Sequence, residues 1–384
     1  MSTSTESDSQ RATRRIRLGM VGGGDGSFIG AAHRIAARLD DQFELVAGAF
    51  SSTPERAHAS AARLHIAPDR SHADYAAMAA AEAQREDGID AVVIATPNHL
   101  HVPVAQAFVN HGIHVICDKP MATSLAEAQV LAQAVRERGL LFLLTYTYAG
   151  YPMVRQARER VAAGELGDVR IVQVEYAQDW LSEPVEQQGN KQAEWRADPQ
   201  RAGPAGALGD IGTHAYQLAR YVSGLTVHEL SAELSTFVPG RALDDHVQAM
   251  LRFEGGARGM LWASQVASGA CNALRLRVYG TRASLHFDQE QPEQLWFAPL
   301  GQPARLLRRG MGPQSVAQAS ASRIPAGHPE GYFEAFAELY RDFARAWRGG
   351  QSPAMPGLQD GLDGIAFIEA VLSSHRQNAR WVRL

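Results

Sequence analysis

The feature that most constrains this chain is an alternation of two patterns over residues 16–148. Short apolar runs rich in β-branched residues (IRLGMV, FELVAGAF, AVVIAT, HVICD and LFLLTYT) alternate with longer alanine-rich stretches, in which apolar residues return every three to four positions. The first pattern predicts buried strands and the second predicts amphipathic helices. Repeated βαβ units with right-handed crossovers place helices on both faces of a parallel sheet. We therefore predict an α/β, doubly wound N-terminal domain.

The pattern changes after residue 148. Longer runs of alternating apolar and polar residues follow, such as VRIVQVEYA and LRLRVYG, with glycine-rich turns between them. Alternation predicts strands with one buried and one solvated face, hence an open, mainly antiparallel sheet. We expect residues 149–384 to form an α+β domain. It should contain a long loop from about Gly301 to Pro325 and two closing helices, and residues 1–15 should form a disordered tail.

Composition excludes several classes of function. The 384 residues suit two domains, and a net charge of -4 without a basic stripe argues against nucleic acid as a partner. Two cysteines without a CxxC pair or a Cys/His cluster argue against a disulfide framework and a metal site. No apolar run approaches the roughly 18 residues of a spanning helix, and the polar N-terminus lacks a signal peptide. We expect a cytoplasmic enzyme that binds neither metal nor membrane.

The first predicted strand runs into a glycine-rich turn, GGGDGSFIG at residues 22–30, which opens a helix. Such a turn lets the backbone approach a pyrophosphate, whose charge is met by free N–H groups at the helix start. Gly22 and Gly24 match the dinucleotide fingerprint, whereas the third glycine, Gly30, comes three residues late. A glycine turn can also serve only to reverse the chain, but this context predicts a Rossmann domain over residues 16–148. The candidate cofactor contacts are Gly22, Gly24, Ser27, Phe28 and Ile29.

The second predicted strand ends near Phe50, where an acidic residue would bind the ribose of NAD. This chain has serines there, Ser51 and Ser52, followed by Arg56. A missing carboxylate and a nearby arginine favour NADP, because arginine pairs with a 2′-phosphate. The alternative is that Arg56 is a solvated helix residue. We take Ser51, Ser52 and Arg56 as candidate cofactor contacts and leave the choice of cofactor open at this point.

Two motifs follow at the ends of the next two predicted strands. Thr96-Pro97-Asn98-His99 and Asp118-Lys119-Pro120 together resemble the signature of the Gfo/Idh/MocA family, the glucose–fructose oxidoreductase and inositol dehydrogenase group. The family usually has Glu-Lys-Pro in the second motif, so this chain keeps the carboxylate and the lysine. Ligands bind outside the carboxyl ends of strands in such sheets, which places Lys119 near a substrate oxygen. The candidate cofactor contacts here are Thr96, Pro97, Asn98, His101, Asp118 and Lys119.

The resemblance continues in the second domain, where Asp210-Ile211-Gly212-Thr213-His214 is similar to the family's Asp-x-Gly-x-His motif. Asp and His four residues apart lie on one face of a helical turn, where the carboxylate can orient the imidazole. Alone, such a pair is more often structural. The resemblance implies three catalytic residues: His214 takes the hydroxyl proton, Lys119 binds the developing alkoxide and Asp210 holds His214.

The resemblance covers essentially the whole chain. The lengthened glycine turn and the AQDWL and GHPEGY segments look like those of inositol and levoglucosan dehydrogenases, which generally use NAD. It implies a dehydrogenase that moves a hydride between nicotinamide and a secondary alcohol carbon of a cyclic polyol or sugar, such as inositol, levoglucosan or a related pyranose. It also implies that residues 149–384 bind the substrate and form a homodimer or homotetramer through the antiparallel sheet. NAD is favoured and NADP stays open. The alternatives are an NAD-dependent glycosidase of the same fold and a non-catalytic NAD(P)-binding sensor.

Aromatic and polar side chains of the second domain are candidates for the substrate pocket, because sugars expose C–H faces to rings and hydroxyls to polar groups. A buried aromatic core is the alternative for the tryptophans. Asp244-Asp245-His246 can be a substrate or subunit contact, or simple turn chemistry. The candidate substrate contacts are Lys119, Tyr176, Trp180, Trp195, Arg196, Asp210, His214 and His328.

Overall fold

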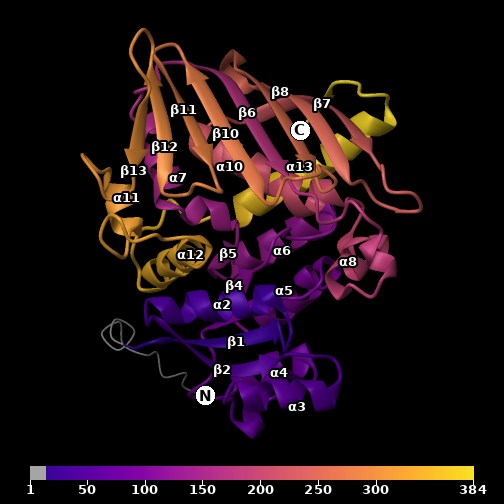
Figure 1. Ribbon diagram of the computed structural model, residues 1–384. Coiled ribbons are helices and arrows are strands. Elements are labelled where there is room, and N and C mark those ends of the chain that lie inside the picture. The colour runs from indigo at the N-terminus through magenta and orange to yellow at the C-terminus, as the bar shows by residue number, and fades with distance from the viewer. Residues whose placement is uncertain (1–13) are drawn as a thin grey trace.

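Five parallel strands form the sheet of the N-terminal domain in the computed structural model, which describes residues 14–384 (Figure 1). Their order is β2-β1-β3-β4-β5, so the chain reverses its winding direction between β1 and β3, where an open α/β sheet forms its ligand crevice. The predicted doubly wound fold is confirmed. The strands are β1 (Ile16–Gly22), β2 (Phe43–Ala49), β3 (Ala91–Ala95), β4 (His114–Cys117) and β5 (Phe142–Leu144).

Helices cover both faces of this sheet. Successive residues of the central strand β3 point to opposite faces and all are apolar, so both faces must be buried. All five residues of β3 are buried; Val92 and Ile94 join one hydrophobic cluster, while Val93 joins the other. A strand buried on both faces reads as a continuous apolar run, which is how the sequence presents it. The helices are α2 (Phe28–Leu39), α3 (Pro54–Arg63), α4 (Tyr75–Ala83), α5 (His101–Asn110) and α6 (Leu125–Glu137).

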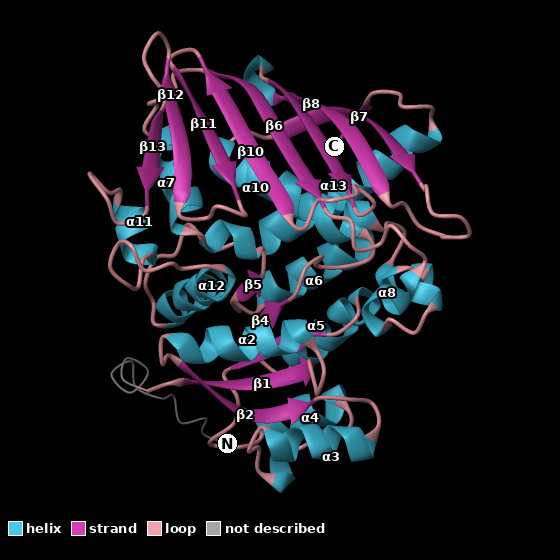
Figure 2. Cartoon of the chain, in the orientation of Figure 1, coloured by secondary structure: helices cyan, strands magenta, loops and turns pink. Residues whose placement is uncertain are grey.

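The second sheet has nine strands in the order β13-β12-β11-β10-β6-β9-β8-β7-β14 (Figure 2). Its pairs are antiparallel except for β6 and β9, which run parallel. The expected mainly antiparallel sheet is thus confirmed. The strands are β6 (Val169–Ala177), β7 (Val227–Ser235), β8 (His246–Phe253), β9 (Arg258–Ser264), β10 (Ala273–Gly280), β11 (Ala283–Asp288), β12 (Gln294–Pro299), β13 (Arg305–Arg308) and β14 (Val382–Arg383).

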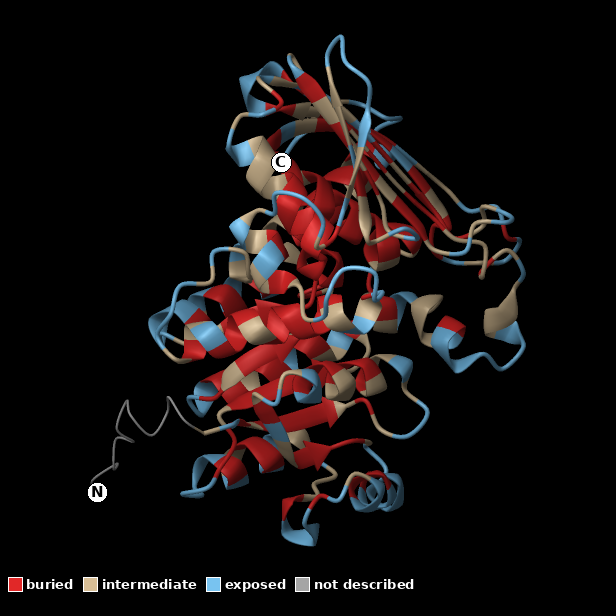
Figure 3. Ribbon diagram, turned by 60° about the vertical axis from the view of Figure 1, so that its left-hand side comes forward, coloured by how far each residue is buried: buried red, intermediate tan, exposed pale blue. Residues whose placement is uncertain are grey.

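Helices pack on one face of this sheet only. The strands stand in front of α7 (Pro152–Ala162), α10 (Thr213–Ser223) and α13 (Leu358–Arg376) in Figure 1, and no described helix lies on their other face. Along β8 the residues alternate accordingly, with Val247 and Leu251 buried and Met250 exposed. The buried interior continues from these helices into the first domain (Figure 3).

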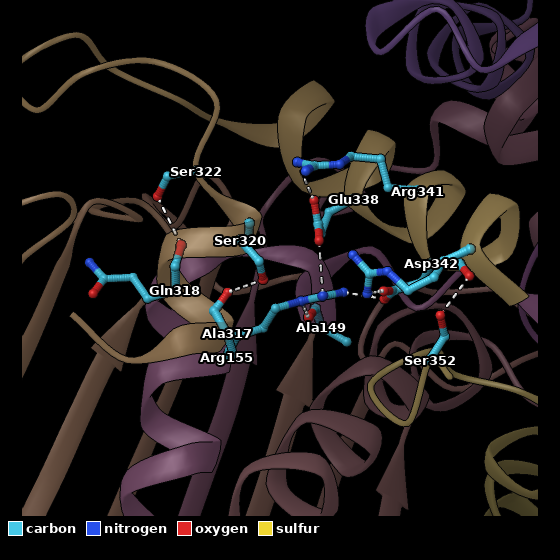
Figure 4. A network of polar contacts seen from close by, with 12 residues as sticks. Ala149, Arg155, Ala317, Gln318, Ser320, Ser322, Glu338, Arg341, Asp342 and Ser352 are labelled. Carbon is cyan, nitrogen blue, oxygen red and sulfur yellow. Dashed lines mark hydrogen bonds and ion pairs between the residues drawn. The ribbon is translucent and has the colours of Figure 1, made fainter. Parts of the chain in front are cut away.

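A buried ionic network joins two helices of the second domain, α7 and α12 (Tyr332–Trp347) (Figure 4). Arg155 of α7 pairs with Glu338 at 3.0 Å and with Asp342 at 2.5 Å, and donates to the carbonyl of Ala149 at 3.2 Å. The same helix packs its aromatic residues against α2 and β1 of the first domain. Both domains are therefore braced by α12.

Two expectations need correction. The segment from Gly301 to Pro325 is not one loop, because it contains β13, which pairs with β12, and the short helix α11 (Val316–Ala321). Arg14, assigned to the disordered tail, pairs with Asp90 at 2.7 Å; residues 1–13 of that tail lie outside the described residues. The domain boundary at residues 148–149 stays a prediction. Two short helices, α8 (Lys191–Arg196) and α9 (Pro199–Ala202), precede α10.

Within residues 14–384, no helix has both the length and the apolar character that crossing a bilayer requires.

Candidate functional site

The glycine turn after β1 lies against the ends of the two neighbouring strands. A Cβ on Gly22, whose φ is +75°, would lie 2.5 Å from the carbonyl oxygen of Ala95, and one on Gly24 would lie 2.8 Å from that of Phe50. Both distances are closer than real Cβ contacts allow, so only glycine fits. The turn therefore leaves the bare backbone at the carboxyl edge of the sheet, which suits a pyrophosphate.

Gly30 allows the close helix packing that the third glycine of the dinucleotide fingerprint provides, although it comes three residues later in the sequence. A Cβ on Gly30 would lie 2.3 Å from the carbonyl oxygen of Gly23, so this glycine lets α2 pack closely on the turn. Ser27 caps α2, because its Oγ accepts the N–H of Gly30 at 3.1 Å. The extra residues bulge outward at Gly26, where a Cβ would meet nothing. The unusual spacing thus lengthens the turn without removing its function.

The other predicted contacts at this end differ in exposure. Phe28 is 64% exposed, with its ring 6.1 Å from that of Tyr332, while Ile29 packs against the core. After β2, Ser51 accepts the N–H of Thr53 at 3.2 Å, and Ser52 and Arg56 are exposed. No acidic side chain stands between Phe50 and Thr53, where a ribose-binding carboxylate is expected in such a domain.

The loops after β3 and β4 are held together by a buried histidine. His101 lies with Nδ1 2.6 Å from the carbonyl oxygen of Pro120 and with Nε2 3.0 Å from that of Thr96. Both ring nitrogens are thus occupied by the backbone, and His101 braces the two loops; the expectation that it contacts the cofactor is not supported by this geometry. Pro97, which follows Thr96, directly precedes a short 3-10 helix.

Two polar residues at the same edge are also held by neighbours. The Asn98 amide donates to the carbonyl of Ala202, in α9 of the second domain, at 2.8 Å. Asp118 accepts the N–H of Lys119 at 2.9 Å and the hydroxyl of Thr145 at 3.0 Å. These bonds fix the backbone from which the Lys119 side chain extends.

Lys119 and Asp210 form the centre of the site. Lys119 Nζ donates to Asp210 Oδ1 at 3.0 Å and also to the backbone oxygen of Asp210. Asp210 Oδ2 accepts from Arg196 Nε at 3.2 Å and from Gln265 Nε2 at 2.8 Å. Burial alone would raise the pKa of Asp210, but Lys119 and Arg196 outweigh it and hold that pKa well below its ordinary value. The carboxylate is therefore ionised.

His214 lies beside this centre, but Asp210 does not hydrogen-bond to it. Its Nδ1 is buried without a hydrogen-bond partner among residues 14–384, and its ring meets those of Tyr148 and Tyr146 edge-on, at 4.9 and 5.6 Å. The expectation that Asp210 holds His214 needs correction. Residues Leu208–Gly212 form a π-helical turn, which is wider than an α-helical turn and changes the angle between the two side chains.

The surroundings of His214 favour its neutral form. Burial lowers the pKa of His214 well below its ordinary value of 6.5, and the charge of Lys119 lowers it further, while Asp210 acts in the opposite direction. A neutral imidazole can accept a proton, whereas an imidazolium cannot. His214 is thus prepared to act as a base at neutral pH.

A hydrogen-bonded wall of polar and aromatic residues flanks His214. The hydroxyl of Tyr148 bonds to that of Tyr176, which donates to Asn272 Oδ1 at 2.7 Å. Gln178 donates to the same oxygen at 2.7 Å and accepts from Trp180 Nε1 at 3.0 Å. Such a wall offers both rings and polar groups to a hydroxylated ligand.

A pocket opens beside the wall, lined among others by Asn98, Trp195, Arg196, Asp210 and Gln265. The Arg196 guanidinium lies 4.3 Å from the Trp195 ring centre and 5.9 Å from that of Trp180. Arg196 thus links both tryptophans to the Asp210 carboxylate.

His328 is the predicted substrate contact that the structure does not bring to this site. It is exposed in the loop before α12, with Nδ1 3.3 Å from the Pro325 carbonyl oxygen. Its own carbonyl accepts from Arg309. Sequence reasoning also missed Tyr148, Gln178, Gln265 and Asn272; their only signal is that they are polar residues at or just beyond strand ends. No cluster of three or more His, Cys, Asp or Glu side chains suited to a metal occurs in the described part of the chain.

Comparisons with known proteins decide the family. A family model described as "Oxidoreductase family, NAD-binding Rossmann fold" matches residues 16–146, and one described as "GFO/IDH/MocA C-terminal domain" matches residues 154–286. The chain belongs to the Gfo/Idh/MocA family of oxidoreductases. The resemblance seen in the sequence is confirmed, and so is NAD as the cofactor of the N-terminal domain, which the glycine turn fits.

Several members of the Gfo/Idh/MocA family are similar over nearly their full length. The crystal structure of an oxidoreductase from Sinorhizobium meliloti is 49% identical, covers 96% of this chain and 100% of its own, and superposes with a TM-score of 0.88. An inositol dehydrogenase homolog from Azotobacter vinelandii, crystallised with NAD+, is 39% identical, covers 97% of this chain and 98% of its own, and has a TM-score of 0.93. Levoglucosan dehydrogenase of Pseudarthrobacter phenanthrenivorans is 30% identical, and the match covers 96% of this chain and 98% of that enzyme.

Proposed function

We propose that this oxidoreductase is a dehydrogenase for a secondary alcohol carbon of a cyclic polyol or sugar. The observation that carries the proposal is the meeting of Lys119 from the first domain with Asp210 and His214 from the second, at the carboxyl edge of the sheet where the glycine turn also lies. Bound NAD supplies a hydride acceptor at that edge.

The residues of the chain have separate tasks in this reaction. Burial and Lys119 keep the pKa of His214 low, so that its imidazole is neutral before the reaction and can accept the proton of the substrate hydroxyl. Lys119 donates a hydrogen bond to the oxygen that becomes negative as the carbon is oxidised. Asp210 orients the Lys119 ammonium through its 3.0 Å bond and balances its charge. Asp210 is thus a partner of Lys119 rather than the support of His214.

The pocket and the relatives both support a cyclic, hydroxylated substrate. Trp180, Trp195 and Tyr176 offer ring surfaces, while Gln178 and Arg196 lie near them with polar groups. The Azotobacter vinelandii homolog was crystallised with NADH and myo-inositol, and levoglucosan dehydrogenase was crystallised with NADH and levoglucosan. We therefore take a cyclitol or an anhydrosugar as the first substrates to test.

We also propose that a second copy of the chain covers the outer face of the nine-stranded sheet. That face exposes five large apolar side chains, and Met250 and Met260 stand directly opposite each other on the paired strands β8 and β9. Ile171 and Tyr279 are likewise paired across β6 and β10, and polar residues such as Gln173 and Arg277 lie between the apolar ones. Exposed apolar side chains within a polar surface are typical of a protein interface. The five residues are Ile171, Met250, Met260, Tyr279 and Trp296.

The test of the proposed reaction is incubation of the protein with NAD and single candidates from a panel that includes myo-inositol and levoglucosan, with NADH followed by its absorbance. A dehydrogenase accumulates NADH in proportion to the oxidised sugar. A glycosidase that uses NAD internally releases cleaved sugar without net NADH, and a sensor does neither. Absence of NADH with every cyclic polyol and sugar would refute the proposal.

A further inference from the structure

Two adjacent buried carboxylates, Asp244 and Asp245, directly precede β8 and bond to different parts of the chain. Asp245 accepts the N–H groups of Phe237 and Val238, at 2.9 and 3.0 Å, within the connection from β7 to β8. That is turn chemistry, as the sequence allows. Asp244 instead reaches the segment before α10, in a different part of the fold.

Asp244 binds three successive N–H groups there. Its Oδ1 accepts from Gly206 at 2.7 Å, its Oδ2 accepts from Leu208 at 2.8 Å, and its backbone oxygen accepts from Ala207 at 2.8 Å. The first N–H groups of a helix have no partner inside the helix. A Cβ on Gly206 would lie 2.1 Å from the Asp244 backbone oxygen, so glycine is required for this approach. Asp244 thus caps the helical segment from across the fold.

The capped segment carries the site. It begins with the π-helical turn Leu208–Gly212, which contains Asp210, and continues into α10, which contains His214. A carboxylate at the start of a helix is also stabilised by the helix dipole. We propose that Asp244 is a positioning residue, which fixes the start of this segment and thereby sets Asp210 and His214 against Lys119. The effect on turnover rests on the proposed function, whereas the capping itself does not.

The burial of Asp244 supports a functional reason for its presence. Burial raises the pKa of Asp244 to about 6 and the neighbouring Asp245 raises it too, against the bonds from Gly206 and Leu208. Because the folded pKa lies above the ordinary value of 3.8, the stability of the fold falls as pH rises through that interval and Asp244 ionises. At neutral pH the ionised Asp244 therefore lowers the stability of the fold, yet it lies where its hydrogen bonds fix the segment that carries Asp210 and His214.

The capping is tested by hydrogen–deuterium exchange on Asp244→Asn, whose amide group has the shape of the carboxylate but turns a donor toward one of the N–H groups. Exchange in the peptide covering residues 205–214 should become at least about tenfold faster, because protection follows local opening. Ser374→Ala is the matched control: Ser374 is fully buried and accepts the N–H of Ala232 at 2.9 Å, in another part of the fold. Unchanged exchange at residues 205–214 in Asp244→Asn, or an equal increase there in Ser374→Ala, would overturn the proposal.

The positioning role is tested by turnover with NAD and whichever of myo-inositol and levoglucosan the wild type oxidises. Asp244→Asn should lower kcat at least about tenfold with little change in the Kd of NAD, whereas Ser374→Ala should keep kcat. In a protein that already carries Asp210→Asn, Asp244→Asn should lower kcat by a much smaller factor, because the effects of residues that act through one another are not additive. Full additivity would overturn the positioning role. If the wild type oxidises neither sugar, the proposed substrates fail, and the exchange measurement still decides the capping.

Discussion

Replacement of Lys119 by alanine is the perturbation whose size follows most directly from the structure. Lys119 is one of two lysines among 37 basic residues, and its side chain is 13% exposed. Nearly all other basic residues of the chain are arginines. The ammonium group of Lys119 therefore stands where the proposed reaction needs a donor to the substrate oxygen that becomes negative. Removal of one donor to a developing oxyanion costs about 2.7–4 kcal/mol, or a factor of about 10² to 10³ in kcat.

The same substitution should destabilise the fold without unfolding it. Asp210 keeps two of its three side-chain donors, Arg196 and Gln265, in Lys119→Ala. The ammonium group loses two hydrogen bonds, to Oδ1 and to the backbone oxygen of Asp210, which together cost about 3 kcal/mol at the lower end of the range for charged bonds. A fall of several degrees in Tm should therefore accompany the loss of turnover.

The assay is steady-state oxidation of the active sugar, with NAD affinity measured by fluorescence titration. We expect kcat to fall at least about a hundredfold while the Kd of NAD changes by less than about threefold. Lys191→Ala, at the exposed start of α8, is the matched control and should behave like the wild type. Turnover within about threefold of the wild type in Lys119→Ala would exclude Lys119 as the donor to the developing oxyanion.

Three other predictions address proton transfer, cofactor choice and assembly. The rate of alcohol oxidation should rise with pH and level off below pH 6.5, the ordinary pKa of histidine, because burial and Lys119 lower the pKa of His214. Asp210→Asn should move this rise to still lower pH, and His214→Asn should abolish it. An unchanged pH profile in folded His214→Asn would exclude His214 as the base. Ser51→Asp should raise the ratio of kcat/KM for NAD to that for NADP through repulsion of the 2′-phosphate, and a constant ratio would place Ser51 away from the ribose. Met260→Glu should shift the mass measured by light scattering toward the monomer, and an unchanged mass would exclude this face as the interface.

Most of the first domain could be predicted because its signals are local. Its strands are mainly apolar runs, although β1 contains Arg17 and β2 contains Glu44, and most of its helices are amphipathic repeats, so windows of a few residues carry the assignment. The exception is α4, which is alanine-rich throughout and lacks a clear amphipathic repeat. β13 could not be predicted, because it lies among glycines, prolines and serines, and exists through its pairing with β12, where Leu307 stands opposite Leu295. Pairing between strands is a tertiary property that composition hides.

The three central residues of the candidate site could be predicted, but their bonds and the polar residues around them could not. The motifs identify Lys119, Asp210 and His214 as residues that should meet, and the structure brings them together. The i, i+4 spacing also predicts that Asp210 bonds to His214, which is wrong, because the π-helical turn and the donors Arg196 and Gln265 draw the carboxylate toward Lys119. Such competition between partners from different elements cannot be derived from spacing alone.

In the proposed reaction, a hydride passes from a ring carbon of a cyclic polyol or sugar to NAD at the site of Lys119 and His214. Its most direct test is a single turnover of the wild type with myo-inositol or levoglucosan that carries deuterium on its alcohol carbons, followed by mass spectrometry of the nicotinamide cofactor. We expect reduced cofactor with one deuterium per molecule and an equal amount of oxidised sugar, with both formed at least about a hundredfold more slowly in Lys119→Ala. Reduced cofactor without deuterium, or cleaved sugar without reduced cofactor, would contradict the proposed reaction.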